Sequence, residues 1–181
     1  MLLLLILACA LANNASSQAA TEKKLYLLKA AAQQQWCIYR SETEWNCDVQ
    51  RQQAMVVATV EHIRGRLIAV NVTEQDETGD WIVYDNYTIG ADSQPQSLKR
   101  TVNILPGDRS EELMFQVRGG RASQLSRTTR QLGTNKPLHN ADSWLPNVPV
   151  VARVQAFPFA SLIAPERLKT LPLRRCVPVG R

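Results

Sequence analysis

Short runs in which apolar and polar residues alternate fill the middle of the chain, from Ala54 to about Arg130. These runs are rich in β-branched and aromatic residues, and clusters of turn-forming residues separate them, which is typical of strands joined by turns. The six runs read AMVVATVE, RLIAVNVTE, DWIVYDNYTI, LKRTVNIL, EELMFQV and ASQLSR. Because the connections are too short to hold crossover helices, the pattern predicts an antiparallel meander.

The alternation also predicts which side of each strand is buried. In the fourth run Leu98, Val102 and Ile104 fall on one side, whereas the residues between them are mostly polar. One face of the sheet is therefore expected to be core, and the other to face water or to line a groove. We expect a mainly β fold, in which six to seven strands form a curved antiparallel meander that stays open or closes into a half-barrel.

The segment before the meander, residues 21–35, is predicted to be an amphipathic helix. It contains strong helix formers and no Gly or Pro, and Thr21 can cap its first turn. Leu25, Leu28 and Ala32 recur at the spacing of one helix face, which would pack on the sheet.

Residues 36–48 predict a hairpin closed by a disulfide. Cys37 and Cys47 are symmetric about a loop at residues 41–43, so one register places them directly opposite each other. Opposed Cα atoms in antiparallel strands are about 4.5 to 5.5 Å apart, which suits a disulfide. We therefore expect a Cys37–Cys47 bridge and a free Cys176. The alternative is a bridge from either residue to Cys176, which would pin the C-terminal tail.

The alternation of apolar and polar residues ends after the meander. Residues 131–148 contain Gly and Pro at irregular intervals and predict a polar surface loop. Val150 to Phe157 is expected to return as one more strand, and the tail LPLRRCVPVGR to be irregular because of its Pro and Arg content. Residues 20–181 are expected to form a single globular domain.

The N-terminus predicts export. Met1 to Ala12 is an unbroken apolar run, too short to span a bilayer, and small residues follow it at positions suited to cleavage. We expect residues 1–19 to be a signal peptide, although no Lys or Arg precedes the run, and we expect no transmembrane segment after cleavage. The mature protein would be periplasmic or secreted; the alternative is a lipoprotein anchored through Cys9.

Charge changes the picture in the second half of the chain. Residues 1–90 hold 7 Lys and Arg against 10 Asp and Glu, whereas residues 91–181 hold 14 against 6. Outside the cytoplasm such a surface would meet lipid headgroups, lipopolysaccharide, acidic polysaccharide or another protein, with nucleic acid the least expected partner. The alternative is that these arginines only keep the domain soluble.

The sequence contains few residue patterns that are typical of catalytic or metal-binding sites. His62 is expected in a solvated hairpin turn, and no CxxC, H-E-x-x-H, G-x-S-x-G or phosphate-binding loop occurs. His139 with Asp142 and Ser143 is the one grouping that could serve a hydrolase, but its spacing is arbitrary. Glu74, Asp76 and Asp80 are expected to form an ordinary acidic turn. We expect no cofactor and no metal.

The wet face of the sheet is the predicted ligand-binding surface. It would combine an aromatic ring, hydroxyl and amide groups with guanidinium groups, a set that suits polar or anionic ligands. The predicted residues are Tyr84, Thr101, Asn103, Gln116, Arg118 and Arg121. The sequence thus favours an exported, non-enzymatic binding module. The alternatives are the hydrolase and an envelope assembly protein whose free Cys176 links chains.

Overall fold

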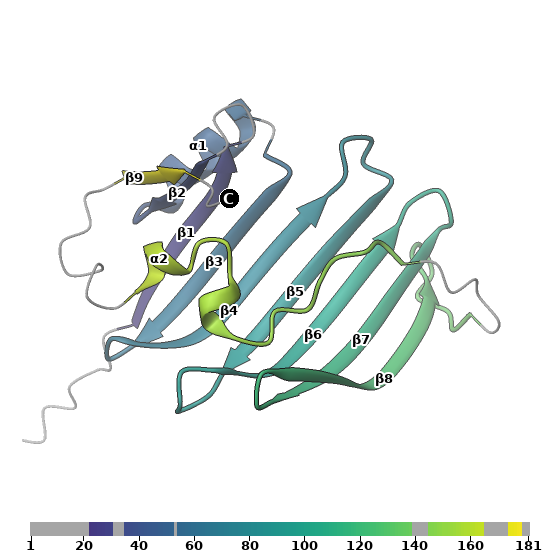
Figure 1. Ribbon diagram of the computed structural model, residues 1–181. Helices are drawn as coiled ribbons and strands as arrows, with labels where there is room; N and C mark the ends of the chain where they lie inside the picture. The colour runs from purple at the N-terminus through teal and green to yellow at the C-terminus, as the bar shows by residue number, and fades with distance from the viewer. Residues whose placement is uncertain (1–21, 31–34, 53, 139–144, 165–173, 179–181) are drawn as a thin grey trace, which may run out of the picture.

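The computed structural model describes residues 22–30, 35–52, 54–138, 145–164 and 174–178. They form one antiparallel sheet of nine strands in the order β8-β7-β6-β5-β4-β3-β1-β2-β9 (Figure 1). The sheet is not closed, since β8 and β9 stand at opposite edges. The prediction of a mainly β, antiparallel fold is confirmed, and the sheet has more strands than the six to seven expected.

The six predicted runs form six consecutive strands. From β3 to β8, each strand pairs antiparallel with the next one along the chain. They are β3 (Val56–Ile63), β4 (Arg66–Gln75), β5 (Trp81–Ile89), β6 (Pro95–Ile104), β7 (Arg109–Arg118) and β8 (Arg121–Gln131). Two of the turns use consecutive residues with positive φ, 52° and 77° at Arg64 and Gly65 and 56° and 75° at Gly119 and Gly120. That geometry is the type I′ turn, whose twist matches the strands of a hairpin.

The predicted N-terminal helix is wrong where the structure describes the segment. Residues 22–30 form β1 (Glu22–Ala30), and β2 (Gln35–Tyr39) runs back beside it. In β1, Leu25 and Leu27 face one side of the sheet and Tyr26 and Leu28 the other, and all four are buried. Because both faces are covered here, the strand lacks the alternation that marks a half-buried strand.

The predicted hairpin over residues 36–48 is also wrong, because a helix follows β2. Helix α1 (Glu42–Gln52) begins after Ser41, whose Oγ accepts a hydrogen bond of 3.3 Å from the backbone N of Glu44. Trp45 anchors the helix on β1, since its Nε1 donates to the carbonyl of Leu27 at 2.9 Å. The helix therefore covers the β1–β2 end of one sheet face.

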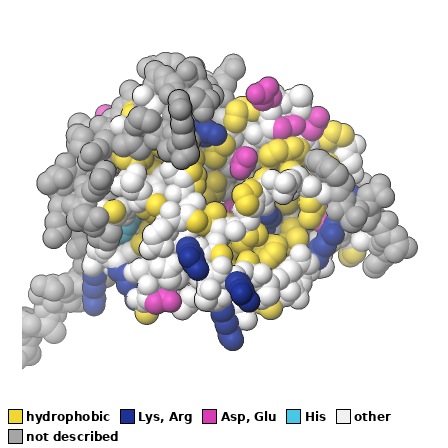
Figure 2. All heavy atoms as spheres, viewed as in Figure 1, with side chains coloured by type: hydrophobic (Ala, Val, Ile, Leu, Met, Phe, Trp, Pro, Cys, Tyr) yellow, Lys and Arg dark blue, Asp and Glu magenta, His cyan; other side chains and the backbone are white. Residues whose placement is uncertain are grey.

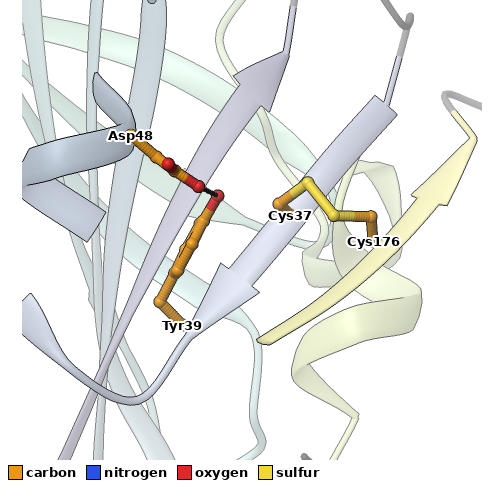
Figure 3. Close-up of a disulfide and its surroundings, with 4 residues drawn as sticks. All are labelled: Cys37, Tyr39, Asp48 and Cys176. Atoms are coloured by element: carbon orange, nitrogen blue, oxygen red, sulfur yellow. Dashed lines mark hydrogen bonds between the residues drawn. A yellow bond between two sulfur atoms is a disulfide. The ribbon is translucent and has the colours of Figure 1, made fainter. Parts of the chain in front are cut away.

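The disulfide joins Cys37 to Cys176, which corrects the predicted Cys37–Cys47 bridge (Figure 3). The tail is not irregular either: β9 (Arg174–Pro178) pairs with β2 and places the two cysteines directly opposite each other. Cys47 lies exposed on α1 with a free thiol. The alternative bridge is thus the one formed, and Cys176 is not available to link chains.

A strap, defined as residues 145–157, crosses the other face of the sheet (Figure 1). No strand forms at residues 150–157; the strap is irregular and ends in the short 3-10 helix η2 (Val154–Ala156). Helix α2 (Ala160–Ile163) follows it. Phe157, Phe159 and Leu162 are buried against the apolar face of the sheet, so the main core lies between the sheet and this returning segment.

The predicted signal peptide, residues 1–19, and the alternative anchor Cys9 lie outside the described residues. Among the residues that the structure describes, no helix has the length and apolar character that crossing a membrane requires.

Candidate functional site

The uncovered face of the sheet carries part of the predicted ligand surface. Tyr84 of β5 lies directly opposite Thr101 of β6, and Asn103 is opposite Ile82, two positions further along. Tyr84 is 36% exposed. These side chains form a shallow polar surface on the face opposite the strap, as the alternation predicted.

A cleft of about 740 Å³ lies at one end of the sheet, where the β5–β6 and β7–β8 turns meet the strap. We call it the turn-end cleft. Its lining is Asp92, Gln94, Pro95, Gln96, Gln116, Val117, Arg118, Gly119, Gly120, Ala152, Arg153 and Gln155. The three contributing segments are far apart in the sequence, so the cleft exists only in the folded chain.

Local hydrogen bonds shape the β5–β6 side of the cleft. The turn is closed by the backbone N of Gly90, which donates to the carbonyl of Gln94 at 2.8 Å. Asp92 supports it by accepting a hydrogen bond of 3.1 Å from the backbone N of Gln94. The Asp92 carboxylate is therefore engaged in holding the turn.

The strap closes the cleft through two contacts. The backbone N of Val154 donates to Oε1 of Gln94 at 3.4 Å, which ties the strap to the β5–β6 turn. On the other side, the guanidinium of Arg153 lies directly against Gly120, where a side chain would meet it. A residue with a Cβ at position 120 would have to displace Arg153, and its φ of +75° also favours glycine. The turn and the strap thus fix each other.

The cleft presents positive charge and unused hydrogen-bonding groups. Arg118 and Arg153 are both exposed, and neither takes part in an ion pair within the described segments. The side-chain amides of Gln96, Gln116 and Gln155, which also line the cleft, have no hydrogen-bond partner among the described residues. Guanidinium groups bind carboxylate and phosphate in a fork, and amides both donate and accept.

Charge is divided between the two ends of this face. Figure 2 shows most of the visible Lys and Arg side chains along the lower margin and most of the visible Asp and Glu side chains along the upper margin. The lower margin holds the β5–β6 and β7–β8 turns in the same view, so the cleft lies at the basic end. Such a division raises the local concentration of anions near the cleft.

The structure brings together only some of the predicted ligand residues. Gln116 and Arg118 line the turn-end cleft. Arg121 lies just outside it, directly opposite Arg118 across the β7–β8 turn. The open-face residues Tyr84, Thr101 and Asn103 do not reach the cleft. Arg153 was missed because nothing in its local sequence signals that residue 153 returns to residue 120.

A buried ionic cluster, which we call the strap clamp, holds the strap on the sheet. It consists of Asp85, Tyr87 and Arg100. Arg100 contacts both carboxylate oxygens of Asp85 at 2.6 Å, and its Nη1 donates to the carbonyl of Val148 at 2.6 Å. The hydroxyl of Tyr87 accepts a hydrogen bond of 3.0 Å from the backbone N of Val151. The clamp therefore joins two strands to a segment some fifty residues away in the chain.

Burial sets the protonation of this cluster. It raises the pKa of Tyr87 to about 12, with the charge of Asp85 adding to the effect, so the phenol stays neutral. Burial alone would lower the pKa of Arg100, but the hydrogen bonds and charge of Asp85 outweigh it and raise that pKa. The ion pair is satisfied internally, which is how buried charges persist in proteins.

The other residues that the sequence singled out for possible chemistry, His62 and the acidic residues of the β4–β5 turn, contribute to the fold. His62 is not in a solvated turn: it lies in β3 and is 1% exposed. Asp76 accepts hydrogen bonds from the hydroxyl of Thr78 and the backbone N of Trp81, so it supports the β4–β5 turn. Across the described residues, no group of three or more His, Cys, Asp or Glu is arranged to hold a metal ion.

The alternative catalytic group, His139 with Asp142 and Ser143, lies outside the described residues. Comparison with known proteins finds no match for this chain among protein-family models, curated proteins or solved structures. The fold and the cleft define a class in general terms: an open antiparallel sheet whose strap completes a basic, polar cleft.

Proposed function

We propose that this protein is an exported, non-enzymatic binding module that holds a polar or anionic ligand in the turn-end cleft. The observation that carries the proposal is that Arg118 and Arg153, from distant segments, both line the turn-end cleft and have no ion-pair partner in the described residues. Unpaired guanidinium groups beside free amides suit recognition of an acidic group.

Export is supported by the cysteine chemistry as well as by the apolar N-terminus. A disulfide between Cys37 and Cys176 persists in an oxidising compartment and is rare in the cytosol. Tyr84, Thr101 and Asn103 on the open face, and Arg121 at the mouth of the cleft, remain predicted secondary contacts for a ligand larger than the cleft.

The proposal is tested by reversing the charge of the cleft. The variant Arg118→Glu/Arg153→Glu is compared with the wild type for retention on a heparin column, with salt as the eluent. We expect at least a tenfold loss of affinity, because each charge-assisted hydrogen bond is worth about 1.5 to 3 kcal/mol. The variant should elute at clearly lower salt.

The matched control is Arg40→Glu/Arg66→Glu, which changes the net charge by the same amount at exposed residues that do not line the cleft. It should elute close to the wild type. Equal shifts for both variants would mean that retention reflects net charge alone, and the proposed site would be wrong.

A further inference from the structure

The size and the chemistry of the turn-end cleft together restrict the class of ligand that can bind there. We infer that the cleft binds an acidic carbohydrate, a sugar chain that carries carboxylate or sulfate groups. This inference rests on the proposed function and goes further by naming the class of ligand.

The cleft is larger than a simple anion would fill. At about 740 Å³ it falls within the range of about 300 to 1,000 Å³ found for small-molecule sites. A water molecule takes about 30 Å³ of liquid volume, so an inorganic anion of a few such volumes would fill only a fraction of the cleft. A ligand that fills the cleft therefore offers more than its charged group.

The hydrogen-bonding groups of the cleft match hydroxyl groups. Gln96, Gln116 and Gln155 line the cleft from three separate segments, and their side-chain amides have no hydrogen-bond partner in the described residues. An amide presents both donors and an acceptor, and a hydroxyl both donates and accepts, so each amide can bind sugar hydroxyls. The two guanidinium groups are donors only, and an acidic group both accepts their hydrogen bonds and balances their charge.

The lining disfavours nucleotides and lipid chains. None of the twelve lining residues is aromatic, and single-stranded nucleic acids are held largely by stacking of bases on aromatic rings. Only Pro95, Val117 and Ala152 contribute apolar side chains, which is too little to bury an acyl chain. A polar, hydroxyl-rich and acidic molecule fits this lining better than either of those two classes.

Two arginines that face each other beside the turn-end cleft indicate that the ligand is an oligosaccharide with several acidic groups. Arg118 and Arg121 are directly opposite each other across the β7–β8 pair, and like charges so placed destabilise a sheet. An acidic group bound between them would relieve the repulsion. Because Arg118 lines the cleft and Arg121 lies outside it, a ligand with acidic groups at intervals can contact both.

The experiment compares defined probes by isothermal titration calorimetry on the full-length protein. The probes are tetragalacturonate, a sulfated heparin tetrasaccharide, the neutral maltotetraose and sodium sulfate. We expect at least one acidic tetrasaccharide to bind at least tenfold more tightly than both maltotetraose and sulfate. Both acidic probes carry carboxylates and only the heparin tetrasaccharide carries sulfate, so tighter binding of heparin would show that sulfate groups add to the affinity.

Two variants separate the charge from the hydroxyl contacts. Arg118→Gln/Arg153→Gln should weaken the acidic tetrasaccharide at least tenfold. Gln155→Leu should weaken it severalfold and leave sulfate binding unchanged, whereas the control Gln124→Leu, on the exposed strand β8 outside the cleft, should change neither.

The outcomes distinguish the inference from the proposed function. Sulfate binding as tightly as the acidic tetrasaccharides would indicate a simple anion site, which overturns the inference and leaves the proposed function standing. Equal binding of maltotetraose would overturn it as well. If none of the charged probes binds and heparin retention is insensitive to Arg118 and Arg153, both fail.

Discussion

At the scale of single residues, His62 is one of the few polar side chains that are buried in the described part of the chain. It lies in β3, 1% exposed, directly opposite Lys23 of β1. Burial lowers the pKa of His62, and the charge of Lys23 lowers it further. The imidazole is therefore neutral in the folded protein at pH values at which the unfolded chain begins to bind a proton.

This pKa predicts a loss of stability in mild acid. As the pH falls through about 6.5, the ordinary pKa of histidine, the unfolded chain takes up a proton that the folded protein resists, so the free energy of unfolding decreases. The slope contributed by one proton reaches at most about 1.36 kcal/mol per pH unit. Urea denaturation at pH 8, 7, 6 and 5 should show a smaller loss for His62→Leu than for the wild type.

The difference between the wild type and His62→Leu reports the contribution of His62 to the pH dependence of stability. Burial raises the pKa of Glu74, and protonation of a carboxyl with a raised pKa stabilises the fold as the pH falls, which is the opposite direction. That contribution is present in both proteins and cancels in the difference. Identical pH profiles for wild type and variant would contradict the assignment.

At the scale of elements, the sequence predicted the strands whose signal is local. β3 to β7 alternate apolar and polar residues because one face is covered and the other is not, and short turns separate the strands as far as the polar, exposed β8. β1 has no such signal because both faces are buried. β9 depends on pairing with β2, a partner far away in the chain, which no local pattern encodes.

Helix α1 shows a signal that was present and was outweighed. Ser41, two intervening residues and Glu44 form the S-x-x-E pattern of a capping box, which marks the start of a helix. The symmetric spacing of Cys37 and Cys47 suggested a hairpin instead. In the helix the same spacing leaves Cys47 exposed, so the symmetry had no structural meaning.

The residues of the candidate site also fall into those that a local sequence pattern predicted and those that it did not. Alternation along β7 placed Gln116 and Arg118 on a polar face, and both line the turn-end cleft. Arg153 and Gln155 join them only because the strap returns across the sheet, a long-range event that residue patterns do not report. The β7 part of the site was thus accessible from sequence, and the part that the strap contributes was not.

The pairing of the cysteines predicts that β9 is an energetic anchor of the β2 edge. The Cys37–Cys176 bridge closes a loop with a sequence separation of 139 residues. Loss of a native disulfide costs about 2 to 5 kcal/mol, and long loops give the larger values in the chain-entropy model. Cys176→Ala should lower the free energy of unfolding by that amount in urea denaturation.

The matched control is Cys47→Ala, since this thiol is free and exposed on α1 and alanine favours a helix. Its effect should stay within about 0.5 kcal/mol, as for other surface substitutions. Peptide mapping without reduction should recover Cys37 linked to Cys176. A cross-linked peptide that contains Cys47 would refute the pairing.

At the scale of the whole molecule, the sheet depends on segments that return to it. One face would be exposed without the strap and α2, whose Phe157 and Phe159 complete the core. The strap clamp adds polar contacts in the middle of the same face, between Arg100 and the carbonyls of Val148 and Pro149. The same strap carries Arg153 into the cleft, so stability and the candidate site share one element.

The strap clamp predicts a large cost for removing one of its charges. Arg100→Leu leaves Asp85 buried, with 6% of its side chain exposed, and without its ionic partner. Breaking such a buried pair costs about 3 to 5 kcal/mol, whereas replacing both partners with apolar residues is often nearly neutral. In urea denaturation the double variant Asp85→Leu/Arg100→Leu should therefore recover most of the stability lost in Arg100→Leu.

A neighbouring surface pair provides the control. Lys99 lies next to Arg100 in β6 and pairs with Glu112 at 2.6 Å, with 48% and 44% of the two side chains exposed. Lys99→Ala should cost no more than about 1 kcal/mol, because solvent screens an exposed pair. Arg100→Leu should also speed tryptic cleavage after Arg153, since the strap loses its anchor. Equal costs for Lys99→Ala and Arg100→Leu, with unchanged cleavage, would show that the clamp does not hold the strap.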